Sequence, residues 1–184
     1  MSKFPRVGVI GAGQLAQMSL APAAALGIEL IPFANSMQDS AAKIAPHVVG
    51  DYKNLDAVRE FAKKCDLVTF EHELIPISII KTLEAEGLKF LPSSQTFQYS
   101  QDKALMRQKL EHLPAPKWQV VTSAIDWNYP AIAKSISGGY DGRGVWKVNS
   151  KEELTEKCWP GYTQKGMKTM FGKRYPNCVK NKKK

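Results

Sequence analysis

The residues best suited to chemistry lie in a glycine-rich stretch between two short apolar runs. Residues 138–144 read GGYDGRG, and the runs at 131–134 and 145–148 predict a strand on each side. Glycines allow a positive φ and let backbone N–H groups approach an anion closely, while Lys134 and Arg143 add positive charge. The stretch is therefore predicted to bind phosphate, and a purely structural turn is the alternative interpretation.

A second glycine motif lies near the N-terminus. The apolar run at residues 6–10 leads into GAGQLA at 11–16, and a helix-compatible stretch follows until Gly27. This order predicts a β-turn-α unit of the Rossmann type, in which the first amides of the helix favour an anion. The next predicted strand, residues 28–33, ends in Phe33 rather than in the acidic residue that holds a ribose, so NAD is disfavoured.

Three polar residues, Glu71, His72 and Glu73, directly follow a strand predicted at 66–70. Ligands collect at the carboxyl ends of parallel strands, so this triplet is expected at the same edge of the sheet as the GAGQ turn. Successive side chains of a strand point to opposite faces, which makes the triplet a poor metal site. A substrate-binding role for one glutamate is easier to build, and a solvated strand end with a satisfied histidine is the alternative.

The elements that position these residues alternate between strands and helices, which predicts an α/β fold with a parallel sheet. The first domain is expected to end near residue 98, and an antiparallel sheet to follow it. From residue 158 onward no hydrophobic period is present, and no secondary structure is predicted there. The remaining expected elements are strands at 48–49, 88–91 and 118–121 and helices at 55–64, 75–86 and 102–112.

Composition sets the class of protein. Hydrophobic residues make up 43% of the 184, enough for a core, and no run of 18 apolar residues exists, so a cytoplasmic protein is expected. The three cysteines show no CxxC and are expected as reduced thiols. Of the net charge of +9, residues 159–184 hold +8, so the nearly neutral remainder does not favour nucleic acid. A basic arm that binds nucleic acid or acidic partners is a minor alternative.

Four stretches together resemble the ATP-grasp family of N5-carboxyaminoimidazole ribonucleotide synthases, the ATPase subunit of phosphoribosylaminoimidazole carboxylase. They are VGVIGAGQLAQM at 7–18, LVTFEHE at 67–73, QDK at 101–103, and Lys134 with GGYDGRG at 138–144. The resemblance covers residues 6–157. It implies a Rossmann-like pre-ATP-grasp domain and the beginning of an ATP-grasp domain. It also implies a ligase of purine biosynthesis that uses ATP, Mg²⁺ and bicarbonate to carboxylate aminoimidazole ribonucleotide through carboxyphosphate.

The same resemblance assigns roles to particular residues. The catalytic positions would be Tyr140, Asp141 and Arg143, with Asp141 as acceptor of the amine proton. The substrate would be bound by Gly13, Gln14, Leu15 and Glu73. No residue is assigned to a metal. The residues implied for ATP are Lys103, Lys134, Gly138, Gly139, Gly142 and Gly144.

The resemblance stops where the character of the sequence changes. The predicted domains are 1–98 (Rossmann-like), 99–157 (partial ATP-grasp) and 158–184 (irregular basic tail). Family members continue into a second lobe with the magnesium ligands, which cannot be located here. We therefore expect a truncated or frameshifted form of the enzyme, with an inactive nucleotide-binding remnant as the alternative. A homodimer is implied by the family.

Overall fold

The computed structural model describes residues 4–121, 127–138, 144–151 and 153, and the backbone of 162–170 and 173–180. The chain divides into two compact units, residues 1–106 and 107–184, and each is described by itself. Among the described helices none is long and apolar enough to cross a membrane.

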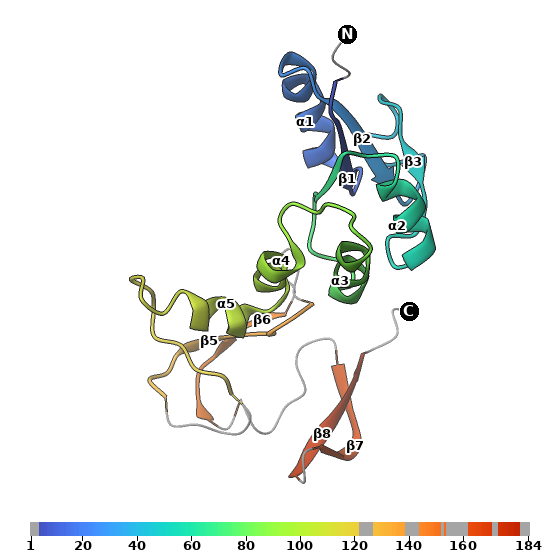
Figure 1. Cartoon of the computed structure of the whole chain (residues 1–184). Coiled ribbons are helices and arrows are strands. Elements are labelled where there is room, and N and C mark those ends of the chain that lie inside the picture. The colour runs from blue at the N-terminus through green and yellow to red at the C-terminus, as the bar shows by residue number, and fades with distance from the viewer. Residues whose placement is uncertain are drawn as a thin grey trace. The chain divides into compact units, whose positions relative to one another are not determined.

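The first unit is built on a four-stranded parallel sheet in the order β3-β2-β1-β4 (Figure 1). Strand β1 lies inside the sheet, where Val7 pairs with Leu30 on one side and with Leu67 on the other. The apolar runs of the sequence therefore form strands as predicted, and the α/β fold class is confirmed. The strands are β1 (Arg6–Ile10), β2 (Glu29–Ala34), β3 (Val48–Val49) and β4 (Leu67–Phe70).

Helices alternate with these strands, and their ends follow the expected signals. At the start of α2, Asn54 Oδ1 accepts hydrogen bonds from the N–H groups of Asp56 and Ala57, both at 3.0 Å. Gly27 and Gly87 follow α1 and α3 with φ of 69° and 88°. The helices are α1 (Gln14–Ala25), α2 (Leu55–Ala62), α3 (Ile77–Ala85) and α4 (Ser94–Gln101).

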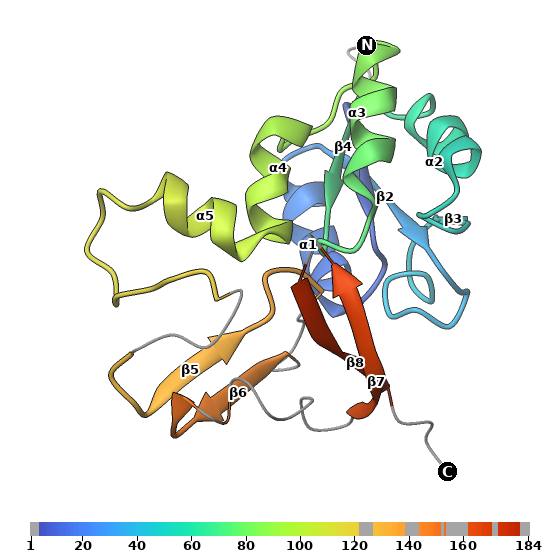
Figure 2. The same cartoon turned by 90° about the horizontal axis from the view of Figure 1, so that it is seen from below.

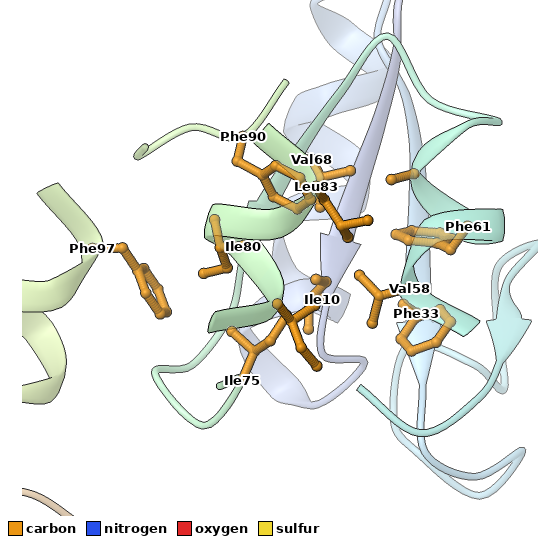
Figure 3. Close-up of a cluster of buried hydrophobic side chains, with 12 residues drawn as sticks. Ile10, Phe33, Val58, Phe61, Val68, Ile75, Ile80, Leu83, Phe90 and Phe97 are labelled. Carbon is orange, nitrogen blue, oxygen red and sulfur yellow. The ribbon is translucent and has the colours of Figure 1, made fainter. Parts of the chain in front are cut away.

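The sheet is covered on both faces, with α1 on one side and α2 and α3 on the other (Figure 1). Val9 belongs to the small alanine-rich cluster beneath α1, whereas its neighbour Ile10 points into the larger core, as the alternation of a strand requires. Figure 3 shows that this larger core gathers side chains from the sheet, α2, α3 and α4. Its buried members include Ile10, Phe33, Val58, Phe61, Val68, Ile80, Leu83 and Phe97.

Three parts of the first 121 residues differ from the sequence prediction. Helix α4 was not predicted, because it presents little apolar surface and its start depends on the Ser94 N–H donating to the Glu84 carboxylate at 2.8 Å. The strand expected at 88–91 is reduced to one bridge between Phe90 and Val68. Residues 118–121 are irregular and exposed rather than a strand, because no other described segment pairs with them.

The second unit contains two antiparallel pairs of strands. Strands β5 (Ala131–Lys134) and β6 (Val145–Val148) pair with Ala131 opposite Val148, as expected for strands on either side of a glycine loop (Figure 2). Strands β7 (Tyr162–Met170) and β8 (Lys173–Lys180) form the other pair, in the segment for which no secondary structure was predicted. The pairing of the two strands with each other, rather than a hydrophobic period, defines them. Helix α5 (Lys103–Lys109) spans the boundary of the units.

Candidate functional site

The glycine turn between β1 and α1 forms the centre of the site in the first unit. Gly11 has a φ of 115°, and its N–H donates to the Phe33 carbonyl of β2 at 3.1 Å, which ties the turn to the sheet. Gly13 stands at the N-cap of α1 and has no side chain to cap the helix, and the first turn of α1 contains no acidic residue. The amides at the start of this helix therefore need an acceptor from elsewhere.

Glu71, the first residue after β4, supplies that acceptor. Its Oε2 accepts from Gly13 N at 2.7 Å, and its Oε1 accepts from Leu15 N at 3.0 Å and Ala16 N at 3.3 Å. The E-H-E triplet and the glycine turn thus lie at the same edge of the sheet, as predicted. The role of Glu71 itself was missed. A usable signal was present, because an acid at the end of the strand beside a G-x-G turn lies within reach of the helix amides.

His72, the middle residue of the triplet, contacts a backbone amide and an aromatic ring. Its Nδ1 accepts from the N–H of Leu74 at 3.2 Å, and its ring lies edge-on to Tyr52 with the centroids 5.0 Å apart. Among the described residues, no group of three or more His, Cys, Asp or Glu could hold a metal ion. The Nδ1 atom of His72 is thus satisfied within the protein.

Glu73 differs from Glu71 in its surroundings. The residue is half-buried, and no described residue gives its carboxylate a hydrogen bond or an ion pair. Its backbone is nevertheless fixed, because the Gln101 side-chain amide donates to the carbonyl oxygens of Glu73 at 2.7 Å and Ile75 at 2.6 Å. A carboxylate without a partner on a fixed loop is suited to accept hydrogen bonds from a ligand.

Gln101 also connects this loop to the start of α5. Gln101 is the last residue of α4, and the helix is interrupted at Asp102, whose Oδ1 accepts from Leu105 N at 2.9 Å and caps α5. Lys103, predicted to contact ATP, is the first residue of α5 and is half-buried. The Gln101 side chain thus connects the Glu73 loop to the segment directly before Lys103.

In the second unit, the base of the predicted phosphate loop is closed by backbone hydrogen bonding. Ser135 N and Ser135 Oγ both donate to the Gly144 carbonyl, at 2.8 and 3.2 Å. Gly138 and Gly144 have φ of 70° and 74°, and Lys134 is exposed at the end of β5. Five predicted site residues lie outside the described part of the chain: Gly139, Tyr140, Asp141, Gly142 and Arg143.

The cysteine of the first unit, Cys65, is a half-buried free thiol. Burial raises the pKa of the Cys65 thiol to about 11, and the nearby charge of Asp66 adds to this effect. The thiol therefore remains protonated at neutral pH, where reaction requires the thiolate. The sequence predicted a reduced thiol here, and Cys65 is a free cysteine.

Comparison with known proteins identifies this arrangement. A family model described as the ribonucleotide synthetase preATP-grasp domain matches residues 4–101. The chain belongs to this family. The match covers β1 through α4, and so includes the glycine turn, Glu71, Glu73 and Gln101 of the preATP-grasp domain.

Individual relatives share the same domain. The N5-carboxyaminoimidazole ribonucleotide synthase of Mycobacterium leprae is 34% identical over 187 aligned positions, and the match covers 92% of this chain and 42% of the relative. The carboxyaminoimidazole ribonucleotide synthase of Aspergillus clavatus, crystallised with ATP, is 30% identical with a TM-score of 0.73 over 84% of this chain and 44% of that one. The A. clavatus enzyme with ADP and 5-aminoimidazole ribonucleotide is 26% identical, with a TM-score of 0.68 over 89% and 49%. The chain thus spans less than half the length of these relatives.

Proposed function

We propose that this chain carries the substrate-binding preATP-grasp domain and the glycine loop of an N5-carboxyaminoimidazole ribonucleotide synthase. Its family membership and the names of its relatives support this assignment. The structural observation that carries it is Glu73, a half-buried carboxylate that is unpartnered among the described residues and whose backbone Gln101 holds in place. It lies two residues after Glu71, which caps the glycine turn of the same domain.

The proposed reaction joins bicarbonate to the exocyclic amine of aminoimidazole ribonucleotide. A bicarbonate oxygen attacks the γ-phosphorus of ATP, which releases ADP and forms carboxyphosphate. The amine then attacks the carbonyl carbon, phosphate leaves, and the amine loses its proton to a base. Carboxyphosphate hydrolyses readily, so the site has to exclude water while the amine approaches.

The substrate would be held by residues of the first unit. Gln14 and Leu15 are exposed at the start of α1, with Leu15 at 63% exposure, and can make contacts through their side chains. The N–H of Gly13 is already donated to Glu71, so this residue would contribute close approach rather than a hydrogen bond. The Glu73 carboxylate would accept hydrogen bonds from the ribose or from the aminoimidazole ring.

By the family resemblance, the residues implied for ATP are Lys103 of the first unit, and Lys134 with the loop of residues 138–144 in the second. Gly138 and Gly144 at the loop base have a positive φ, as glycines of anion-binding loops often do. A cationic lysine beside the amides of such a loop stabilises the charge that moves between phosphoryl oxygens in the transition state. By resemblance, Tyr140, Asp141 and Arg143 would handle carboxyphosphate, with Asp141 as the proton acceptor.

Magnesium would assist the phosphoryl transfer, but the described residues do not fit a site for it, since no cluster of suitable ligands is found among them. No step is therefore assigned to the ion. The family resemblance also implies a homodimer, and a cytoplasmic location is proposed from the composition of the chain. The boundary between the substrate domain and the ATP-binding part is proposed near residue 98.

The experiment that tests this function uses the purified 184-residue chain and two readouts. Aminoimidazole ribonucleotide binding is measured by calorimetry, and ADP release is measured with ATP, Mg²⁺ and bicarbonate, with and without the ribonucleotide. We expect binding that Glu73→Gln weakens by about tenfold or more, the scale of one hydrogen bond to a charged group. Glu60→Gln, which alters an exposed glutamate paired with Lys63 on α2, is the matched control and should bind as the wild type does.

The two readouts separate the proposed function from its alternative. ADP release that depends on the ribonucleotide supports the complete reaction. Binding without release supports the alternative of a nucleotide-binding remnant without turnover. The absence of binding in a chain with the circular dichroism of a folded α/β protein would contradict both.

A further inference from the structure

The start of α1 is, by its physical properties, a position for an anion. Free N–H groups and the helix dipole concentrate positive potential there, and β-turn-α domains commonly use this place for a nucleotide phosphate. In this chain the amides of Gly13, Leu15 and Ala16 all donate to the carboxylate of Glu71. The negative charge that the helix favours is thus supplied by the protein itself.

The glycines of the turn fit this carboxylate closely. A Cβ on Gly11 would lie 2.5 Å from Glu71 Oε2, and a Cβ on Gly13 would lie 2.7 Å from Oε1. Both distances are shorter than any normal contact. The absence of side chains at these two positions therefore makes room for Glu71, which occupies the space that an external phosphate would need.

The adjoining end of β2 is also occupied by the chain. Asp39 Oδ2 accepts from the N–H groups of Asn35 and Ser36 at 2.9 and 3.1 Å, and the N–H of Ala41 donates to the Ala12 carbonyl at 2.8 Å. The loop after β2 is thereby bonded to the glycine turn, and Ala41 is fully buried. A dinucleotide fold places the ribose of its cofactor at this end of the second strand.

We infer that Glu71 is a specificity-determining residue that acts as an internal anion and excludes nucleotide phosphates from the glycine turn. The turn keeps the β-turn-α geometry, but its Gly13, Leu15 and Ala16 amides are satisfied without a ligand. Ligands can then approach this edge through other groups, such as the exposed side chains of Gln14 and Leu15. This inference does not depend on the proposed function, because it concerns the response of the turn to phosphate alone.

The test is a titration of the ¹⁵N-labelled 184-residue chain with inorganic phosphate, followed at the amide signals of Gly13, Leu15 and Ala16. The wild type is expected to show no saturable shift at these three amides. Glu71→Ala removes the carboxylate and leaves the amides free, so a saturable shift is expected at all three. Glu73→Ala removes the neighbouring carboxylate, which accepts none of these amides, and should respond as the wild type does.

Two results would overturn the inference. One is a saturable shift at the three amides in the wild type, which would mean that phosphate displaces Glu71, and this measurement needs no variant to fold. The other is a folded Glu71→Ala chain, shown by a dispersed spectrum, in which phosphate leaves the three amides unchanged. If the alanine variant does not fold, Glu71→Gln serves in its place. This substitution keeps the size of the side chain but replaces one accepting oxygen by an NH₂ group, which donates hydrogen bonds. It should show a weaker saturable shift, and no shift in it would count against the inference.

Discussion

The two glycine-rich turns of this chain use the same residue type for opposite purposes. In the turn after β1, Gly11 and Gly13 are glycines because the Glu71 carboxylate lies where a side chain would be. At the start of the loop after β5, a Cβ on Gly138 would meet nothing within 4 Å. The first turn is filled by the protein, and the described part of the second leaves its surroundings open.

The first turn thus contributes to the stability of the fold, whereas the second is the one that we propose to receive a ligand. Both match the G-x-G spacing that is read as a phosphate motif, and both have glycines with positive φ. The two turns differ in which atoms lie beside the glycines in the folded protein, and the local sequence motif does not contain this information. A glycine-rich turn therefore predicts the approach of some anion to the backbone, but not whether that anion belongs to the protein or to its ligand.

The largest expected effect is that of Gly11→Ala. The new methyl group would lie within 2.6 Å of the Glu71 side chain, and the φ of 115° is one that alanine rarely adopts. Backbone strain and the loss of the Glu71 hydrogen bonds together should lower the free energy of unfolding by about 3 kcal/mol. Urea denaturation followed by circular dichroism measures this change.

Gly87→Ala is the matched control for that substitution. Gly87 lies in the same unit and has a comparable positive φ of 88°, but a Cβ there would meet nothing within 4 Å. The free energy of unfolding should therefore fall by only about 1 kcal/mol, the cost of placing alanine at a positive φ. Equal losses in the two variants would show that Glu71 does not determine the need for glycine at position 11.

The next effect in size concerns the clamp on the Glu73 loop. Gln101→Ala removes both hydrogen bonds to the carbonyls of Glu73 and Ile75, and should lower the free energy of unfolding by about 2 kcal/mol. Gln98→Ala on the same helix removes only an exposed bond to Gln95 within α4 and should cost less than about 0.5 kcal/mol. Calorimetry with aminoimidazole ribonucleotide should also show weaker binding for Gln101→Ala alone. Unchanged binding would mean that the loop keeps its conformation without the clamp.

Gly138→Ala tests the second glycine turn, the one after β5. The φ of Gly138 is 70°, in the left-handed region, and a Cβ built there would meet no atom within 4 Å. The substitution should therefore lower the free energy of unfolding by about 1 kcal/mol, through backbone strain alone. Thermal unfolding measures it alongside Gly11→Ala. A loss as large as that of Gly11→Ala would indicate that the loop base is packed as tightly as the first turn.

Much of the first unit could be predicted from the sequence, because its determinants are local. The apolar runs of β1 and β4 and the stop signals at Gly27 and Gly87 gave the order of strands and helices correctly. The contact between Glu71 and Gly13 joins residues 58 positions apart, and follows only once the order of the strands is known. Helix α4 was missed for the same reason, since its first amide is satisfied by Glu84 of α3 rather than by a local cap.

The smallest expected effect contrasts Glu71 with a carboxylate at the surface. Glu86 accepts from Arg59 Nε at 2.7 Å and from Nη2 at 2.9 Å, and these hydrogen bonds lower the pKa of Glu86 below its ordinary 4.5. A lowered pKa in the folded state contributes stability that is fully present above pH 4.5 and is lost as the pH falls through the lower value. Because the pair is exposed and screened by solvent, the contribution is small.

Glu86→Gln should therefore lower the urea midpoint slightly at about pH 6, and the difference from the wild type should shrink as the pH is lowered below about 4.5. Added salt should shrink it as well, since exposed charges are screened within about 10 Å at 0.1 M. The corresponding loss in Glu71→Gln should resist salt, because the Glu71 carboxylate is held by three backbone amides rather than by a side-chain cation. If salt reduced both losses equally, the distinction between a carboxylate built into the fold and one paired at its surface would be wrong.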